Sequence, residues 1–433
     1  MRLKKLFVLI PTLIALTGCD IQSIFNNLNS NEENTSSEVS NSGESSAEEG
    51  DTLPITGIEK DYTVMIYLCG ADLESQSGYA SSNIAEILTV NLPSNVNVII
   101  ETGGASKWKK YNISSTKLSR YHVENKGLKL DTTLTYASMG ASSTFQSFVE
   151  WGLTKYPAKK TGVVFWDHGA AMDGCCFDEK KNNDGLTNYE VQQAFKNAFK
   201  KTGRTSKLEW VGYDCCLMQV ADIASYNSEF FNYMVASQEM EGGPGWDYQS
   251  WLGDLAANPN IDTRTLLSNM SDSYVEKNGE EYSSASQNDG TLSVLDLSKM
   301  PEFDAKFNAL TKKLRNKVDS SSFTKLFSNS EVIRFGKDGR TYYYDCYDAK
   351  TWCSFLEKSG SSYKGLGASE LLDVLDDLII SHTNGEAHKN ACGLSIVGMT
   401  SGTTEKESYE ENQTPYSDWQ YINCTYGSFY RGY

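Results

Sequence analysis

The chain has 433 residues, a formal net charge of −17 at pH 7, 39% hydrophobic residues and 12% aromatic residues. This length accommodates two or three domains, and the apolar content supports a large core, which excludes disorder of the whole chain. The acidic balance argues against a nucleic-acid partner, because phosphate binding requires clustered Lys and Arg. Ten cysteines are too few for a disulfide scaffold, and a mean hydropathy of −0.45 excludes a protein with many membrane spans.

The first 19 residues have the pattern of an export signal. Three basic residues and no acidic residue stand among the first five, and the apolar stretch at 6–16 is too short to cross a bilayer. The following L-T-G-C sequence ends at Cys19 and resembles the bacterial lipoprotein box, in which the cysteine is acylated and becomes the first residue. The alternative is a chance cysteine beside an ordinary cleavage site. We expect a lipoprotein signal peptide at 1–19 and a lipid anchor at Cys19 on the extracytoplasmic face of the cell membrane.

Residues 20–59 contain nine acidic residues and no basic residue, and no aromatic residue follows Phe25. Such a segment buries too little apolar surface to offset the entropy lost on ordering. It is predicted to be a disordered acidic tether between the membrane and the folded part.

From about residue 60, predicted strands and helices alternate. Compact apolar runs predict strands at 62–68, 95–101, 162–166, 208–213 and 233–236. Helical spacing of apolar residues predicts helices at 83–90, 142–155, 187–200 and 217–226, with Ser142 or Ser143 capping the second and a Thr187–Glu190 capping box opening the third. This alternation predicts an α/β fold with a mostly parallel sheet and helices on both faces.

The pattern continues less regularly beyond residue 255. Helices are predicted at 263–277, 301–318 and 369–381, and strands at 290–297 and 393–397. We expect residues 60–255 to form the core and residues 256–433 to continue the sheet and add a smaller C-terminal subdomain. The aromatic-rich end at 416–433 either packs on the core or contacts other surfaces, and the sequence does not decide between the two.

Two predicted strands end in residues capable of covalent chemistry. One is followed by His168, and the other by Cys215 and Cys216. If the strands are parallel neighbours, the imidazole and a thiol meet at one edge of the sheet, where the imidazole can take the thiol proton and the thiolate can attack a carbonyl carbon. A helix starting at Leu217 would lower the thiol pKa further. His168 stands 48 residues before Cys216, a spacing typical of caspase-type enzymes.

These residues resemble the clostripain family of caspase-like cysteine peptidases. The likeness spans about residues 60–400 and rests on W-D-H-G at 166–169, D-C-C-L-M at 214–218, Y-T-V-M-I-Y-L-C-G-A-D-L at 62–73, A-S-Q-E at 236–239, G-P-G-W-D-Y at 243–248, D-C-Y-D at 345–348 and G-L-S-I at 393–396. It implies a caspase-like fold, Cys216 as nucleophile and His168 as its base or imidazolium partner. Cys215 stands where the family usually has a small residue and stays the rival nucleophile.

The resemblance also implies that Asp214 lies in the primary specificity pocket. A buried carboxylate there would pair with a Lys or Arg side chain before the scissile bond, whereas the alternative is that Asp214 only caps the helix predicted at Leu217. The backbone N–H groups of Gly169 and Cys216 are the expected oxyanion donors. Ala171 stands near the place where relatives tend to have a further Gly.

Lys180 and Lys181 lie in a polar stretch after His168. An enzyme that cuts after basic residues could cut itself there, and the resemblance implies self-processing in this stretch. We therefore hypothesise a zymogen activated by autocleavage after Lys181 or Lys180; the alternative is an ordinary solvated loop.

No metal site is predicted. Cys175 and Cys176 are adjacent and so poor joint ligands, and no C-x-x-C pair occurs in the sequence. Some relatives use calcium, but no D-x-D-x-D-G loop appears, so no cofactor is expected to be required and calcium stays a weakly supported alternative. The later cysteines are expected to be buried or disulfide-bonded: Cys346, Cys353, Cys392 and Cys424.

The sequence thus predicts a membrane-anchored thiol protease that hydrolyses peptide bonds after Arg or Lys through an acyl-enzyme. Its expected partners are peptide or protein substrates and the membrane, without nucleic acid, and it is expected to act as a monomer. The alternative is a non-catalytic surface lipoprotein that binds peptides or polymers on a caspase-like scaffold. The presence of both His168 and Cys216 argues against that alternative, because a binding module needs neither.

Overall fold

The computed structural model describes residues 52–280, 284–338, 341–342, 344–402, 404, 406–412 and 414–429. The predicted signal peptide, Cys19 and nearly all of the predicted tether therefore lie outside the described residues.

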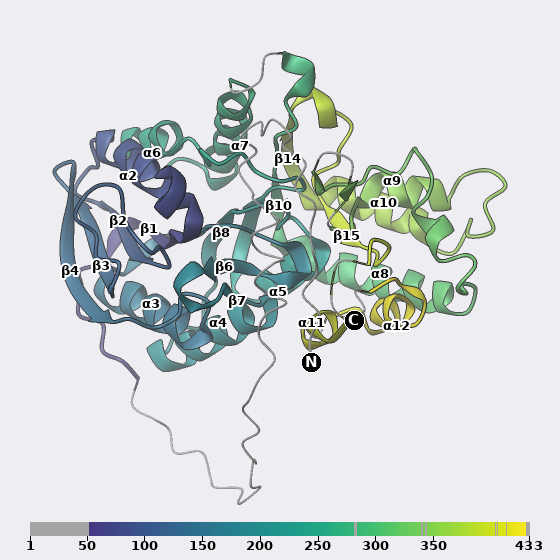
Figure 1. Cartoon of the computed structure of the whole chain (residues 1–433), viewed down its shortest axis with the longest axis horizontal. Helices are drawn as coiled ribbons and strands as arrows, with labels where there is room; N and C mark the ends of the chain where they lie inside the picture. Colours follow the sequence, from purple (N-terminus) through teal and green to yellow (C-terminus); the bar gives the residue numbers. More distant parts are fainter. Residues whose placement is uncertain are drawn as a thin grey trace, which may run out of the picture.

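A nine-stranded sheet in the order β14-β10-β9-β8-β5-β1-β2-β3-β4 runs through the described part of the chain (Figure 1). Its central strands β9, β8, β5, β1 and β2 are parallel, and the strands at both edges are antiparallel. This confirms the predicted α/β fold with a mostly parallel sheet. The strands are β1 (Lys60–Cys69), β2 (Val96–Gly103), β3 (Lys117–Glu124), β4 (Gly127–Thr135), β5 (Ala158–Trp166), β8 (Leu208–Asp214), β9 (Phe231–Ala236), β10 (Thr291–Asp296) and β14 (Ile379–Asn384).

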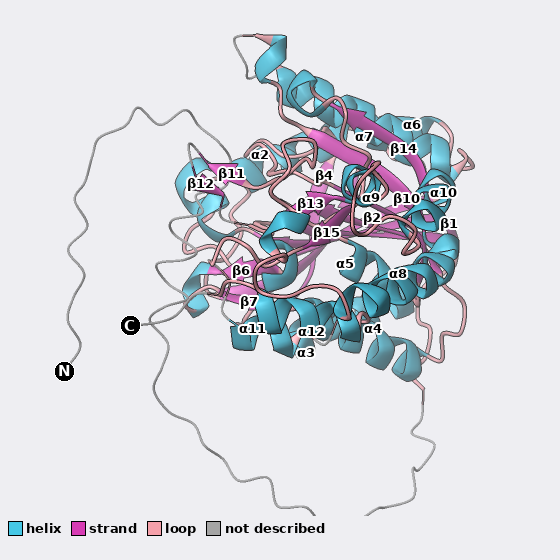
Figure 2. Ribbon diagram, turned by 90° about the vertical axis from the view of Figure 1, so that its right-hand side faces the viewer, coloured by secondary structure: helices cyan, strands magenta, loops and turns pink. Residues whose placement is uncertain are grey.

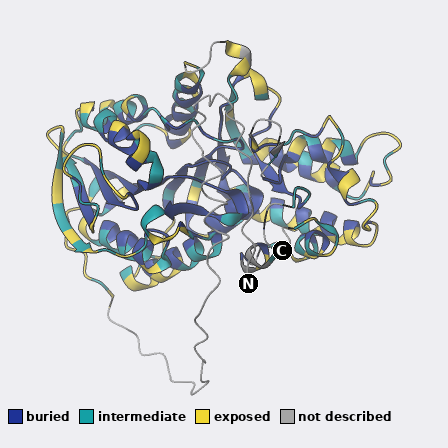
Figure 3. Ribbon diagram, viewed as in Figure 1, coloured by how far each residue is buried: buried dark blue, intermediate teal, exposed yellow. Residues whose placement is uncertain are grey.

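Helices cover both faces of the sheet (Figure 2). One face packs against α2 (Tyr79–Thr89), α6 (Tyr248–Ala257) and α7 (Thr263–Gly279), and the other against α3 (Ser142–Lys155), α4 (Asn188–Thr202), α5 (Ala221–Asn227) and α8 (Met300–Arg315). Strand β1 shows why its sequence is apolar throughout. Val64 and Ile66 belong to the core on the side of α2, α6 and α7, Met65 and Tyr67 belong to the core on the opposite side, and all four are fully buried. Figure 3 shows the strands in the middle of the sheet as buried.

The C-terminal part adds helices and a small sheet at one end of the main sheet. It contains β13 (Cys346–Asp348), paired with β15 (Ser395–Val397), together with α9 (Ala349–Leu356), α10 (Ala368–Leu378), α11 (Lys406–Glu411) and α12 (Ser417–Tyr426). Trp419 is buried, and its ring lies 5.5 Å from that of Trp352. The described aromatic-rich end therefore packs on the core through Trp419 and the buried Tyr416.

Three local predictions were wrong. The helix predicted at 217–226 begins at Ala221, because Leu217 adopts a left-handed backbone with φ of 65°. The helix predicted at 369–381 ends at Leu378, and the next residues form β14, which pairs with β10. Ala141 occupies the cap position of α3, so neither Ser142 nor Ser143 caps it.

Candidate active site

The carboxyl ends of β5 and β8 bring the two predicted reactive residues to one edge of the sheet. These strands are parallel neighbours, with Trp166 opposite Asp214. His168 and Cys216 each follow two residues beyond that pair. The chain packs closely here, since a Cβ on Gly169 would lie 2.3 Å from the carbonyl oxygen and 3.0 Å from the amide nitrogen of Cys216. Only glycine fits between the two segments.

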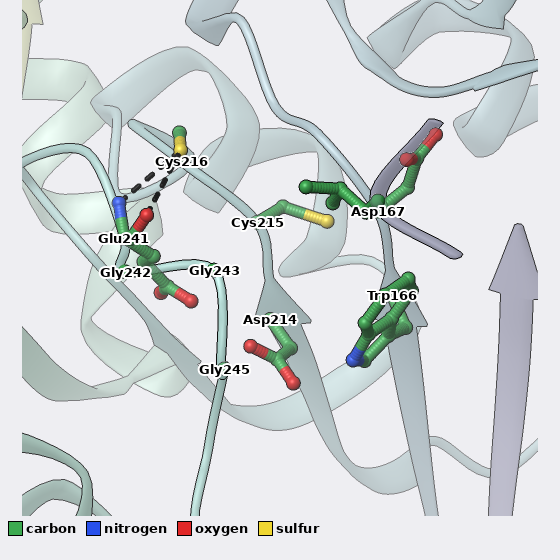
Figure 4. A pocket seen from close by; sticks show the side chains of 10 residues that line it. Trp166, Asp167, Asp214, Cys215, Cys216, Glu241, Gly242, Gly243 and Gly245 are labelled. Carbon is green, nitrogen blue, oxygen red and sulfur yellow. Dashed lines mark hydrogen bonds between the residues drawn. The ribbon is translucent and has the colours of Figure 1, made fainter. Parts of the chain in front are cut away.

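Cys216 lies in a buried position against the segment that follows β9. The Glu241 N–H donates to Cys216 Sγ at 3.2 Å, and Sγ lies 3.8 Å from the Glu241 carbonyl oxygen (Figure 4). An N–H donor directed at sulfur stabilises negative charge on it. The Leu217 N–H donates to the Glu239 carbonyl at 3.1 Å, which holds the strained turn after the cysteine in place.

Cys215 points the other way. Figure 4 shows its sulfur on the side of Trp166 and Asp167, whereas that of Cys216 faces Glu241. Cys215 Sγ lies 3.5 Å from the Phe165 carbonyl, and burial raises the pKa of this thiol well above its ordinary value. Both cysteines are buried, but only the Cys216 sulfur receives a backbone N–H from a described residue, Glu241, so the hydrogen-bond partners favour Cys216 over Cys215 as the nucleophile.

No helix begins directly after Cys216, contrary to the sequence prediction. Helix α5 begins at Ala221, five residues after Cys216, and spans only seven residues. Asp214 does not cap a helix either, because Val220 occupies the cap position of α5. The backbone donor at the Cys216 sulfur is the Glu241 N–H rather than the N-terminus of a helix.

His168 has a carboxylate partner that the sequence reasoning did not assign. Its Nε2 lies 2.7 Å from Asp72 Oδ1. Asp72 follows β1, the neighbour of β5 on the side away from β8. The residue was visible in the sequence as the turn after the first strand, but without a motif that connects it to a histidine 96 residues later.

Asp214 lies in a small pocket beside Cys216. The Tyr248 hydroxyl donates to Asp214 Oδ2 at 2.8 Å, and the Trp246 N–H lies 3.3 Å from both carboxylate oxygens. Burial raises the Asp214 pKa to about 6, although these donors oppose the rise. A Cβ on Gly245 would lie 3.0 Å from both oxygens, so glycine leaves the carboxylate accessible from the pocket.

Glu241 is a second buried acid in the same pocket, and the sequence reasoning missed it. Its Oε1 accepts from Trp246 Nε1 at 3.4 Å, while Oε2 has no hydrogen-bond partner among the described residues. Burial and then the charge of Asp214 raise the Glu241 pKa well above its usual range. No Lys or Arg occurs among the described residues that line the pocket, which are Leu73, Trp166, Asp167, Asp214, Cys215, Cys216, Glu241, Gly242, Gly243 and Gly245. The described lining of this pocket is therefore acidic.

A partly buried lysine, Lys277, contacts the outer side of the pocket wall. Lys277 Nζ donates to the carbonyls of Pro244 at 3.3 Å and Trp246 at 2.9 Å, and pairs with Glu86 at 2.8 Å. Asn83 Nδ2 donates to the Pro244 carbonyl at 2.9 Å. The pocket wall at 242–246 is thus fixed from α2 and α7.

The sequence profile of the clostripain family (Peptidase_C11) matches residues 66–430, most of the chain. The chain belongs to the clostripain family. It is a cysteine peptidase, which sets aside the alternative of a non-catalytic binding protein. No curated protein matches the chain.

Solved structures of C11 peptidases share this fold. The secreted C11 cysteine protease iotapain from Bacteroides thetaiotaomicron is 15% identical with a TM-score of 0.61, covering 84% of this chain and 100% of its own. An inactive zymogen C11 protease from Parabacteroides distasonis is 18% identical with a TM-score of 0.57, covering 86% of this chain and 100% of its own. A secreted C11 cysteine protease from Bacteroides thetaiotaomicron in complex with an irreversible peptide inhibitor is 14% identical with a TM-score of 0.59. The match covers 84% of this chain and 99% of that protease. At these identities the likeness concerns the fold.

The predicted loop with Lys180 and Lys181 is an ordered hairpin in this clostripain-family chain. Strands β6 (Cys175–Asp178) and β7 (Asp184–Leu186) flank a short 3₁₀ turn at Glu179–Lys181. Lys180 is partly buried, with Nζ 3.7 Å from the centre of the Tyr136 ring, whereas Lys181 is exposed. Both residues after Lys181 adopt left-handed backbone conformations, Asn182 and Asn183.

The remaining cysteines are not bridged to one another. Cys175 and Cys176 are buried free thiols, as are Cys346, Cys353 and Cys392, while the free Cys424 is partly exposed. Within the described residues no group of three or more His, Cys, Asp or Glu side chains is placed to hold a metal ion. None of the described helices is both long and apolar enough to span a membrane.

Proposed function

We propose that this peptidase hydrolyses peptide bonds on the carboxyl side of Arg or Lys, with Cys216 as nucleophile and His168 as proton carrier. The observation that carries the specificity is the pair of buried acids, Asp214 and Glu241, in a pocket whose wall also holds Cys216. A Lys or Arg side chain in that pocket would supply the positive charge that its described lining lacks.

The proposed reaction begins with transfer of the Cys216 proton to His168. The thiolate attacks the scissile carbonyl carbon, and the backbone N–H groups of Gly169 and Cys216 stabilise the oxyanion. His168 then protonates the leaving amine, and water attacks the thioester with His168 as base. The close packing of Gly169 on Cys216 supports this assignment, because it brings both donors to one place.

A panel of fluorogenic peptides that differ only in the residue before the scissile bond tests this specificity. Arg and Lys peptides should be cleaved, whereas peptides with Leu, Asp or citrulline at that position should be cleaved at least about 100-fold more slowly, since a neutral side chain leaves the acids unpaired. Citrulline is the sharpest comparison, because it keeps the shape of Arg without the charge. Equal cleavage of the Arg and citrulline peptides would contradict the proposal.

We further propose that the protein is made as a zymogen and cuts itself after Lys181. The pocket that contains Asp214 and Glu241 has a volume of about 20 Å³, which is space for about one water molecule. A Lys or Arg side chain can therefore enter only if the pocket wall at 242–246 moves outward. The hairpin that carries Lys181 is attached directly to the site, since the Cys176 N–H donates to the His168 carbonyl at 3.3 Å. Lys181 is the preferred position because Lys180 is held by Tyr136 and Asp178.

A lipid anchor at Cys19 is proposed for the amino terminus, which places the peptidase on the extracytoplasmic face of the membrane. The support is the basic and apolar leader followed by L-T-G-C. Labelled palmitate fed to expressing cells should enter the wild-type protein and not Cys19→Ala. Equal labelling of both proteins, or of neither, would contradict the anchor.

A further inference from the structure

Three adjacent strands, β1, β5 and β8, are each followed within three residues by a side chain of the proposed site: Asp72, His168 and Cys216. In the sheet, β5 lies between β1 and β8, with Leu68 of β1 opposite Trp166 and Trp166 opposite Asp214. Asp72, His168 and Cys216 follow these paired positions, so the histidine stands between the other two. We propose that Asp72 is a positioning residue that holds the His168 imidazole for proton exchange with Cys216. This inference rests on the proposed roles of His168 and Cys216.

The contact is short and well supported on both sides. Asp72 Oδ1 lies 2.7 Å from His168 Nε2, and the side chains are 17% and 2% exposed, respectively. Asp72 also precedes a π-helical turn at Leu73–Ser77, directly after Ala71 with φ of 43°. A left-handed backbone at a residue other than glycine costs free energy and is retained where the surrounding structure requires it. Here it turns the chain so that the carboxylate faces the imidazole.

Asp167 directly precedes His168 in the chain, but the hydrogen bonds and the pKa shifts favour Asp72 as the carboxylate partner of the ring. Burial acts to raise the Asp72 pKa, but the hydrogen bond and charge of His168 outweigh it, and the pKa lies below its ordinary value. Burial raises the Asp167 pKa well above its ordinary value, and neither oxygen of that carboxyl has a hydrogen-bond partner among the described residues. Of these two carboxyl groups, Asp72 is the one hydrogen-bonded to the ring and the one that ionises more readily.

This pairing assigns a role to each ring nitrogen. Asp72 accepts the Nε2–H, which fixes the tautomer of the neutral ring. Nδ1 then takes the proton from Cys216 Sγ and later gives it to the amine nitrogen of the departing peptide. While the ring carries both protons, the Asp72 carboxylate stabilises the imidazolium, and with it the thiolate.

The chain contains a matched control. His122 Nδ1 lies 2.7 Å from Asp131 Oδ1, the same separation, in a pair formed by the edge strands β3 and β4. Asp72→Asn and Asp131→Asn therefore each remove a carboxylate from a histidine ring, once beside the proposed nucleophile and once near the edge of the sheet. Asp131 also pairs with Lys155 at 2.9 Å and accepts from the Tyr156 hydroxyl, so Asp131→Asn removes at least as many contacts as Asp72→Asn.

The test measures casein hydrolysis, hydrolysis of an Arg peptide, and the rate of alkylation of Cys216 by iodoacetamide as a function of pH. Asp72→Asn should lower kcat by roughly 10²–10³-fold with little change in KM, and should move the alkylation profile of Cys216 to higher pH. Asp72→Glu should recover part of the rate, and Asp131→Asn should behave as wild type.

Wild-type kcat and an unchanged alkylation profile in Asp72→Asn would overturn the proposal. Alkylation is followed by mass spectrometry of the peptide that contains Cys216, on protein whose circular dichroism matches that of wild type, so the readout depends neither on substrate preference nor on loss of fold. If wild type cleaves casein but not the Arg peptide, the proposed specificity fails while the test of Asp72 still stands.

Discussion

Cys216→Ala should lower kcat/KM for Arg and Lys peptides by at least about 10⁴-fold, because the sulfur supplies the covalent intermediate and no other described group replaces it. The same variant should stay a single chain during incubation, whereas wild type should yield two fragments that meet after Lys181. Peptide hydrolysis and the mass of the fragments check both expectations.

Cys215→Ala is the matched control for the cysteine doublet. Its sulfur contacts the Phe165 carbonyl and lies in the core, so its removal should cost on the order of 1 kcal/mol of stability and leave kcat/KM within about threefold of wild type. An active Cys216→Ala with an inactive Cys215→Ala would transfer the nucleophile to Cys215. Fragments that form equally in wild type and Cys216→Ala would assign processing to another protease.

The central strands and most helices were predictable because their sequence patterns are strong and local. Strand β1 is apolar at consecutive positions since both of its faces are buried, and α4 begins with the predicted capping box between Thr187 and Glu190. The end of the helix predicted at 369–381 was wrong for the opposite reason. The apolar residues Ile379 and Ile380 continue the period of α10, and only pairing with β10 makes them a strand.

The meeting of His168, Asp214 and Cys216 at one edge of the sheet was predictable, because each stands at the end of an apolar strand or directly after it. The positions of Asp72 and Glu241 were not predictable, because each lies in a contact that the fold creates between distant segments. Asp72 reaches His168 from a different strand, and Glu241 reaches the Asp214 pocket from the loop after β9. The turn at Leu217 was hidden as well, since its left-handed backbone arises at a residue whose side chain gives no signal for it.

Asp214→Asn should reduce kcat/KM for Arg and Lys peptides by roughly 10²–10³-fold, mainly through KM, because it removes the charge that is proposed to bind the substrate cation. The pH dependence follows from the raised Asp214 pKa of about 6. Below that pH the carboxyl is protonated and neutral, so wild-type kcat/KM for the Arg peptide should fall as the pH decreases through about 6. Asp214→Asn should lack this component of the profile.

Glu241→Gln is the control that separates charge from damage to the pocket. Burial and the charge of Asp214 raise the Glu241 pKa, so this carboxyl holds a proton more readily than Asp214, and its conversion to an amide should cost less activity than Asp214→Asn. The stability of Asp214→Asn gives an independent check. A carboxyl whose pKa is raised in the folded state stabilises the fold below its unfolded pKa, and this contribution is lost as the pH rises through about 6. Asp214→Asn should therefore have a higher Tm relative to wild type at pH 7.5 than at pH 4.5. Suppose that Asp214→Asn is less active and that its Tm relative to wild type is no higher at pH 7.5 than at pH 4.5. This result would show that Asp214 supports the wall of the pocket rather than binding the substrate cation.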